Sequence, residues 1–253
     1  MRIRTLLSGG LAIILSACAH SSQLTSGSDY IARYDDSPAY ASTTFLDDEV
    51  RSIAAIEPDL RFPARIGLAR IEGRTLTTIP GDESQYWAKL SETLGDRYGE
   101  LIPVSPLITA MVNHGQAQSA KDIVGHVRKG SARQHLDYVL IYEVDNRSER
   151  RSNALRLSDL TVLGLFVMPS RKVEIESTAS AILIDVRNGY PYGTATSFAD
   201  KDGTSTFAGR EAKQSKLTDK ARVLAVSNLT DEVEMVFEEL RDKKYQQLVE
   251  AGY

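Results

Sequence analysis

The sequence of 253 residues contains a single cysteine, Cys18. A disulfide framework needs at least two cysteines and a cysteine-based zinc site needs more than one, so both are excluded. The chain also lacks a strong charge of one sign, because 30 Lys and Arg residues oppose 34 Asp and Glu residues. This balance does not indicate a nucleic-acid partner. With 42% hydrophobic and 25% charged residues, the composition is typical of a globular domain and excludes collagen-like, fully disordered and polytopic membrane classes.

The sequence also has no pattern for catalysis or metal binding. Its four histidines do not share a metal-binding spacing such as H-x-x-x-H or H-E-x-x-H; they are His20, His114, His126 and His135. It contains neither a G-x-S-x-G nucleophile elbow nor a glycine-rich phosphate loop between a strand and a helix. We therefore expect no catalytic residue, no metal and no cofactor, and a protein that is not an enzyme.

The first eighteen residues, MRIRTLLSGGLAIILSAC, carry the clearest pattern in the chain. Arg2 and Arg4 form a positive segment, and the apolar run 6–15 that follows is too short to span about 30 Å of hydrocarbon as a helix. Residues 15–18, Leu-Ser-Ala-Cys, resemble the lipobox of bacterial lipoproteins. The resemblance implies that residues 1–17 are a lipoprotein signal peptide and that acylated Cys18 is the first mature residue. An ordinary signal peptide with an incidental cysteine is the alternative.

The lipoprotein resemblance also implies a location. Ala19, rather than aspartate, resembles the pattern that lets a lipoprotein leave the inner membrane. It implies a cell-envelope protein that is held on the outer membrane through lipidated Cys18 and faces the periplasm. A single acyl chain anchors a protein only marginally, whereas a fully modified lipoprotein cysteine carries more than one.

The segment after the cysteine is predicted to be a tether. Residues 19–50 are rich in Ser, Thr, Asp and Tyr, and they contain six acidic residues but a single base, Arg33. Low hydrophobicity combined with charge of one sign is typical of flexible segments. We therefore predict a signal peptide at 1–17, an acidic tether at 18–51 and a single globular domain at 52–253.

Within this domain the pattern alternates between strands and helices. Hydrophobic periodicity, with a turn at Asn188-Gly189, predicts strands at 64–71, 100–104, 137–144, 173–186 and 190–198. Helices are predicted at 82–94, 107–112 and 120–135 and over most of the last fifty residues, with Asp82 and Thr218 as N-caps. This order predicts an α/β (α+β) fold with one mixed β-sheet, helices packed against it and a long C-terminal helix.

Three segments resemble one known arrangement. They are QHLDYVL at 134–140, AILIDVRNG at 181–189 and ARVLAVSNL at 221–229. In this order they resemble envelope lipoproteins and periplasmic domains with a TolB-amino-terminal-like α/β fold, a group that includes the curli secretion channel and the lipoprotein activators of peptidoglycan synthases. The resemblance in layout extends over residues 62–240. It implies a fold but no function, because one fold can serve many functions.

Two further segments are candidates for contacts. Arg147, Arg150, Arg151 and Arg156 fall between predicted strands, where we interpret them either as a contact for lipid headgroups, lipopolysaccharide phosphates or an acidic partner, or as a solvated loop. The apolar run 160–168 has the length of a transmembrane β-strand but does not alternate polar and apolar residues. We leave three roles open for this run: a strand in the core, a contact between subunits or a contact with the membrane.

These features predict a lipid-anchored envelope protein that acts as a non-catalytic binding, scaffold or regulatory module for another envelope component. We expect the membrane and an envelope protein as partners, and no nucleic acid. The alternative is an oligomeric component of a secretion or transport apparatus resembling the curli channel. The sequence does not indicate which component is bound or which process is served.

Overall fold

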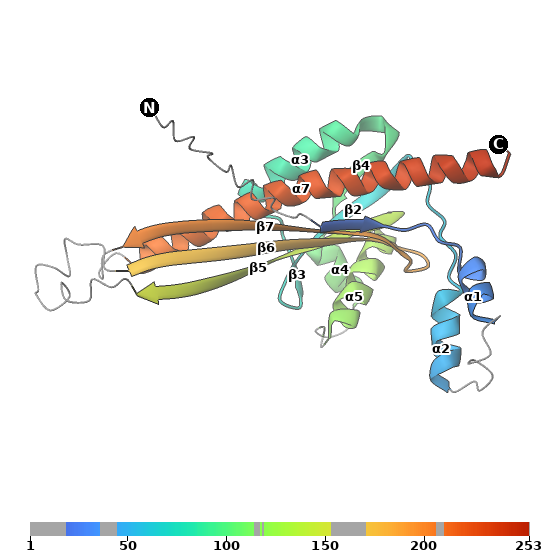
Figure 1. The fold of residues 1–253 in the computed structure, drawn as a ribbon, viewed down its shortest axis with the longest axis horizontal. Coiled ribbons are helices and arrows are strands. Elements are labelled where there is room, and N and C mark those ends of the chain that lie inside the picture. The colour runs from blue at the N-terminus through green and yellow to red at the C-terminus, as the bar shows by residue number, and fades with distance from the viewer. Residues whose placement is uncertain are drawn as a thin grey trace, which may run out of the picture.

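The computed structural model describes residues 19–35, 45–113, 117, 119–152, 171–205 and 210–252. Figure 1 shows a long, twisted sheet with helices on both of its faces. Within the described ranges, no helix is both long enough and apolar enough to cross a membrane. The predicted signal peptide, Cys18, Arg156 and the apolar run 160–168 lie outside the described residues.

The sheet has seven strands in the order β1-β7-β6-β5-β2-β3, and β4 pairs with the first part of β2. Strand β2 runs parallel to β4 and β5, whereas the other neighbouring strands are antiparallel. The strand bounds are Ala19–Ser22 (β1), Ala64–Glu72 (β2), Thr75–Thr77 (β3), Gly99–Pro103 (β4), Tyr138–Ser152 (β5), Arg171–Asp185 (β6) and Pro191–Ser205 (β7). The predicted single α/β domain with a mixed sheet is confirmed.

The helices lie in two layers and one separate pair. Helix α7, which extends along the sheet, and helix α3 cover one face, while α4 and α5 lie against part of the other (Figure 1). Helices α1 and α2 contact each other at one end of the molecule. The bounds are Gly27–Asp35 (α1), Phe45–Ala54 (α2), Gly81–Leu94 (α3), Pro106–Val112 (α4), Ala120–Arg133 (α5) and Arg210–Glu250 (α7), with a 3-10 turn at Gly95–Arg97.

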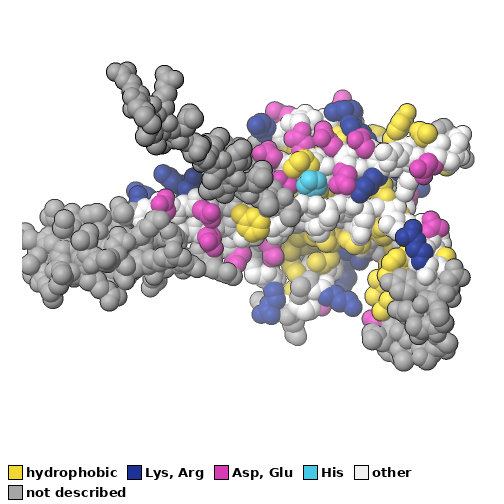
Figure 2. Space-filling model, in the orientation of Figure 1, with side chains coloured by type: hydrophobic (Ala, Val, Ile, Leu, Met, Phe, Trp, Pro, Cys, Tyr) yellow, Lys and Arg dark blue, Asp and Glu magenta, His cyan; other side chains and the backbone are white. Residues whose placement is uncertain are grey.

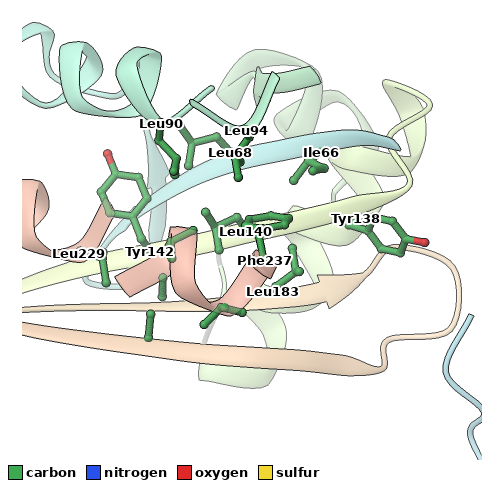
Figure 3. Packing of buried hydrophobic residues seen from close by; sticks show 14 of the residues in the cluster. Ile66, Leu68, Leu90, Leu94, Tyr138, Leu140, Tyr142, Leu183, Leu229 and Phe237 are labelled. Atoms are coloured by element: carbon green, nitrogen blue, oxygen red, sulfur yellow. The ribbon is translucent and has the colours of Figure 1, made fainter. Parts of the chain in front are cut away.

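The two faces of the central strand β5 bury side chains in two different clusters. Tyr138, Leu140 and Tyr142 pack toward α3 and α7, whereas Val139 and Ile141 pack toward α5. This division follows from the period of two in a strand, which sends successive side chains to opposite faces. Figure 3 shows the first cluster, in which residues of β2, β5 and β6 meet side chains of the two covering helices, including Leu90, Leu94, Leu229 and Phe237.

The tether prediction needs correction in its described part. Ala19–Ser22 forms β1, which pairs antiparallel with Thr196 to Gly193 of β7, and Leu24 is buried in the first cluster. Residues 27–35 and 45–51 belong to α1 and α2. The composition of this segment does not predict β1, because the strand is polar. It is held mainly by backbone hydrogen bonds to a sheet edge that would otherwise be open.

The interpretation of residues 145–156 as a loop is also wrong in its described part. Strand β5 continues to Ser152, so that Arg147 pairs with Glu176, Arg150 with Val173 and Arg151 with Lys172 of β6. The polar stretch DNRSERRS lacks the hydrophobic alternation of a half-buried strand, and pairing with β6 extends the strand nevertheless. Consecutive strand positions belong to opposite faces, so positions 150 and 151 do not share one surface.

The two predicted helix caps are not found. Helix α3 begins at Gly81 after Pro80, which puts Asp82 inside its first turn, and α7 begins at Arg210, which puts Thr218 inside the helix. Packing against other elements can shift a helix boundary by several residues. Helix α7 shows such a shift, because it extends along β7 beyond its predicted start.

Candidate functional site: a groove on the open face of the sheet

Helices cover only part of the sheet face that lies opposite α7. Helix α5, with α4 packed beside it, covers the part of this face where Ile71 of β2 and Val139 and Ile141 of β5 are buried. Farther along, alternate residues of β6 and β7 are half-buried or exposed on this face. We call this surface the open face; it comprises Thr178, Ser180, Ile182, Thr194, Thr196 and Phe198.

A groove of about 550 Å³ lies where the open face meets α5. Its apolar lining combines sheet and helix residues, namely Ile71, Ile141, Ile182, Ile123 and Val124, and its polar lining includes Ser119, Glu143, Ser180, Thr194 and Thr196. Figure 2 shows hydrophobic side chains gathered beneath the sheet on the side where α4 and α5 lie. A volume of this size with a few polar groups is typical of binding sites.

A capping box fixes the wall of the groove. Ser119 Oγ accepts a hydrogen bond from the Asp122 backbone N at 3.2 Å, and Asp122 Oδ2 accepts one from the Ser119 backbone N at 2.9 Å. This reciprocal pair satisfies two backbone donors at the start of α5 and sets the residue at which the helix begins. It thereby holds Ile123 and Val124, which follow directly in the first turns, against the sheet.

On the other side of the sheet, a fully buried carboxylate joins four elements. Glu83 of α3 accepts hydrogen bonds from Arg70 Nε of β2 at 3.0 Å and from the Tyr142 hydroxyl of β5 at 2.8 Å, and it pairs with Arg222 of α7. Burial, reinforced by the charge of Glu83, raises the pKa of Tyr142, so this phenol remains a donor. Every charge in this cluster has a partner, which is the condition for burying charges. We assign the cluster a structural role.

A second buried carboxylate closes the turn between β6 and β7. Asp185 accepts hydrogen bonds from the backbone N of Arg187 at 2.7 Å and of Asn188 at 3.1 Å, and from the Tyr192 hydroxyl at 3.3 Å. Tyr138, at the start of β5, donates a hydrogen bond from its hydroxyl to the backbone O of Asp59, in the segment before β2, at 2.9 Å. Burial raises the pKa of Tyr138 to about 12. These contacts hold the segment before β2 against the end of the sheet.

The amino-terminal strand is held from two sides. Along β7, Ser21 Oγ lies 2.9 Å from Thr194 Oγ1. Along α7, His20 Nδ1 lies 3.1 Å from Glu232 Oε2, and Lys243 Nζ donates to Ser22 O at 2.8 Å. The first described residue, Ala19, therefore belongs to the folded sheet, and the residue before it in the chain is Cys18.

Of the residues singled out from the sequence as candidate contacts, the described part of the chain includes three arginines. Arg147, Arg150 and Arg151 belong to β5, while Cys18 and Arg156 lie outside the described residues. The contact role of these arginines stays a prediction. Across the described ranges, His, Cys, Asp and Glu residues form no group of three or more that would hold a metal ion.

Sequence reasoning missed the groove residues for a simple reason. Ile123, Ile141 and Ile182 have the same hydrophobic spacing as residues that are packed beneath a helix. The weak signal that was available is the alternation in β7, where Thr194 and Thr196 stand on one face and Ala195 and Ser197 on the other. Such alternation indicates a half-exposed strand, whose neighbour β6 then shares an uncovered face.

Comparison with known proteins gives no family. No protein-family model and no curated protein matches the chain. Similar solved structures include a PelC dodecamer from Paraburkholderia phytofirmans, at 16% identity and a TM-score of 0.30 over 70% of this chain and 91% of that one. A minor lipoprotein from Acinetobacter baumannii is 11% identical, with a TM-score of 0.35 over 71% of this chain and 95% of that one. Lipoprotein GNA1162 from Neisseria meningitidis is 16% identical, with a TM-score of 0.31 over 62% of this chain and 97% of that one.

Proposed function

We propose that the protein is a lipid-anchored, non-catalytic module of the bacterial cell envelope, and that it binds another envelope component in the groove on its open face. The observation that carries the proposal is the groove itself. Its apolar lining at Ile71, Ile141 and Ile182 lies beside α5, and the rest of the open face has no helix over it in the described part of the chain. Ile71, Ile123 and Ile141 form the buried floor of the groove, while Val124 and Ile182 are half-buried at its surface. A depression with an apolar lining and a few polar groups is typical of a binding site.

The groove favours an extended polypeptide segment as its occupant. It is an open depression on a sheet rather than a closed cavity, and hydroxyl groups of Ser180, Thr194 and Thr196 line one side of its apolar residues. An extended chain presents alternate side chains to such a surface, so that apolar side chains contact the isoleucines while polar groups meet the hydroxyls.

The anchor supports the envelope location. Leu15-Ser16-Ala17-Cys18 has the lipobox pattern, and the folded domain begins one residue later, at β1. Acylation of Cys18 would therefore hold the groove within one domain diameter of the membrane surface. A partner that lies in or on the same membrane then meets the groove at a raised local concentration.

Two charge substitutions in the acylated protein test the groove. Ile182→Glu puts a carboxylate among the apolar lining residues, while the control Thr178→Glu adds the same charge on the same strand and face but outside the lining residues. A photo-crosslinking residue at the exposed position 194 reports contact in intact cells. We expect a discrete crosslinked protein that is lost with Ile182→Glu and retained with Thr178→Glu.

Other outcomes would redirect the proposal. Equal crosslinking with both variants would show that the groove does not bind the partner. A crosslink only between copies of the chain, together with a large oligomer in detergent, would favour the alternative of an oligomeric transport component.

A further inference from the structure

We infer that the domain rests against the lipid surface with one fixed side, the end of β7 beside β1, and that Phe198 contacts the bilayer interface there. The inference rests on the proposed lipid anchor and goes beyond it. An anchor alone, at the end of a flexible tether, would leave the domain free to turn in any direction.

The proposed anchor directly precedes the sheet, because Cys18 is followed in the chain by Ala19 of β1. Consecutive Cα atoms are about 3.8 Å apart across a trans peptide bond, so Cys18 stays within that distance of Ala19. Ala19 pairs with Thr196 of β7. The next residue, His20, lies 3.1 Å from Glu232 and 3.8 Å from Glu239 of α7. The residue that follows the proposed anchor is therefore held by both the sheet and α7.

Phe198 lies on β7 close to the start of β1. It lies two residues beyond Thr196 on β7, about 7 Å along the strand and on the same face. Adjacent strands are about 4.8 Å apart and Ala19 pairs with Thr196, so the Cα atom of Phe198 lies about 9 Å from the Cα atom of Ala19, the residue after the proposed anchor. The Phe198 side chain is 50% exposed, while its backbone O accepts a hydrogen bond from Asn228 Nδ2 of α7 at 3.0 Å.

Charged residues that follow Phe198 on β7 limit the depth of the contact with lipid. Asp200 and Asp202 are exposed and Lys201 is half-exposed immediately after this position. Charged side chains and unpaired strand groups remain hydrated and do not enter the hydrocarbon core. Phe198 therefore reaches the headgroup and upper acyl region, where aromatic side chains are favoured.

The same charges disfavour another strand as the occupant of this edge. Strand β1 covers β7 only from Gly193 to Thr196, and in a mature chain that begins at Cys18 a single residue precedes β1. The rest of β7 has no other strand on its outer side in the described part of the chain. Charged residues on such an edge, here Asp200, Lys201 and Asp202, oppose the addition of a strand.

Tryptophan fluorescence on acylated protein tests the inference. The Phe198→Trp variant is reconstituted in vesicles of phosphatidylethanolamine and phosphatidylglycerol that carry bromine either near the headgroups or near the bilayer centre. Wild-type protein supplies the background from Trp87, which is buried at 2% exposure. The matched control is Tyr245→Trp, because Tyr245 is 69% exposed and lies about 20 Å along α7 from Glu232, the partner of His20.

The emission that Phe198→Trp adds to the background should fall at least twofold with bromine near the headgroups, and less with bromine near the bilayer centre. The emission that Tyr245→Trp adds should be quenched by neither. Equal quenching in the two variants, or quenching in neither, would overturn the fixed orientation. Mass spectrometry of Cys18 and flotation with vesicles separate this failure from failure of the anchor: an acylated Phe198→Trp protein that floats without quenching contradicts only the orientation. A protein that is not acylated contradicts both proposals.

Discussion

The Tyr142 hydroxyl donates a hydrogen bond to Glu83 Oε2 at 2.8 Å, and both side chains are fully buried. The pair joins the central strand β5 to helix α3, and Arg70 and Arg222 bring β2 and α7 to the same carboxylate. The Glu83 side chain therefore links the sheet to both helices that cover one of its faces. Replacing Glu83 is for this reason a sensitive test of the fold.

Replacing Glu83 is expected to destabilise the protein severely. Glu83→Gln removes the charge that neutralises Arg70 and Arg222, and removing one partner of a buried ion pair costs about 3–5 kcal/mol. Urea unfolding of the protein without its signal peptide measures the change. Asp82→Asn is the control, since Asp82 is 44% exposed and such a pair contributes about 0–1 kcal/mol. Similar losses for both variants would refute the role of the buried cluster.

Truncating Phe237 should also reduce stability. Its ring is fully buried and lies 5.9 Å from the Phe62 ring and 5.7 Å from the Tyr98 ring, measured between centroids. Phe237→Ala leaves a cavity between α7 and the sheet, at a cost of about 3–5 kcal/mol. Tyr245→Ala, at an exposed position of the same helix, should change the free energy of unfolding by less than about 0.5 kcal/mol. Thermal and urea unfolding together check both values.

Acid should loosen the start of α1 before the rest of the domain. Glu57 accepts hydrogen bonds from the backbone N of Ser28 at 2.8 Å and of Gly27 at 3.1 Å, and the first of these is the main cause that lowers the pKa of Glu57 from 4.5. A lowered pKa stabilises the folded segment above the unfolded value, and this contribution is lost as pH falls through the folded pKa.

Amide hydrogen exchange at Gly27 and Ser28 measures this loosening. We expect protection to fall as the pH drops below 4.5 in wild type, and to be low at every pH in Glu57→Gln. Protection that is unchanged by pH in the wild type would show that Glu57 does not hold α1.

Alkali should also destabilise the domain, in this case through a tyrosine whose pKa is raised by folding. Burial raises the pKa of Tyr138 from 10.0 to about 12, so the unfolded chain loses this proton at lower pH than the folded protein does. Between these two values the unfolded state binds fewer protons, and stability therefore falls as pH rises. Urea unfolding across this interval should show the decline, and Tyr138→Phe should make it shallower. An identical slope in the variant would contradict the assignment to Tyr138.

Much of the core was predictable from the sequence. The apolar run 138–142 falls within the strand predicted at 137–144, and the structure buries all five of its residues. Polar segments were not predictable in the same way. Residues 145–152 extend β5, and Ala19–Ser22 forms β1, because neighbouring strands offer backbone hydrogen bonds to them. Hydrophobic patterning does not report such pairing.

The sequence by itself determined the prediction of a lipid anchor and the class of fold. The lipobox pattern is a run of adjacent residues that needs no folded context, and hydrophobic periodicity reflects the local geometry of strands and helices. Only the tertiary structure decided that Ile182 is half-buried in the groove while Leu183 is buried in the core. Successive strand residues point to opposite faces of the sheet, and α7 covers the face to which Leu183 belongs. The tertiary structure also decided that β1 begins at Ala19, because that strand forms through pairing with β7, which lies near the other end of the chain.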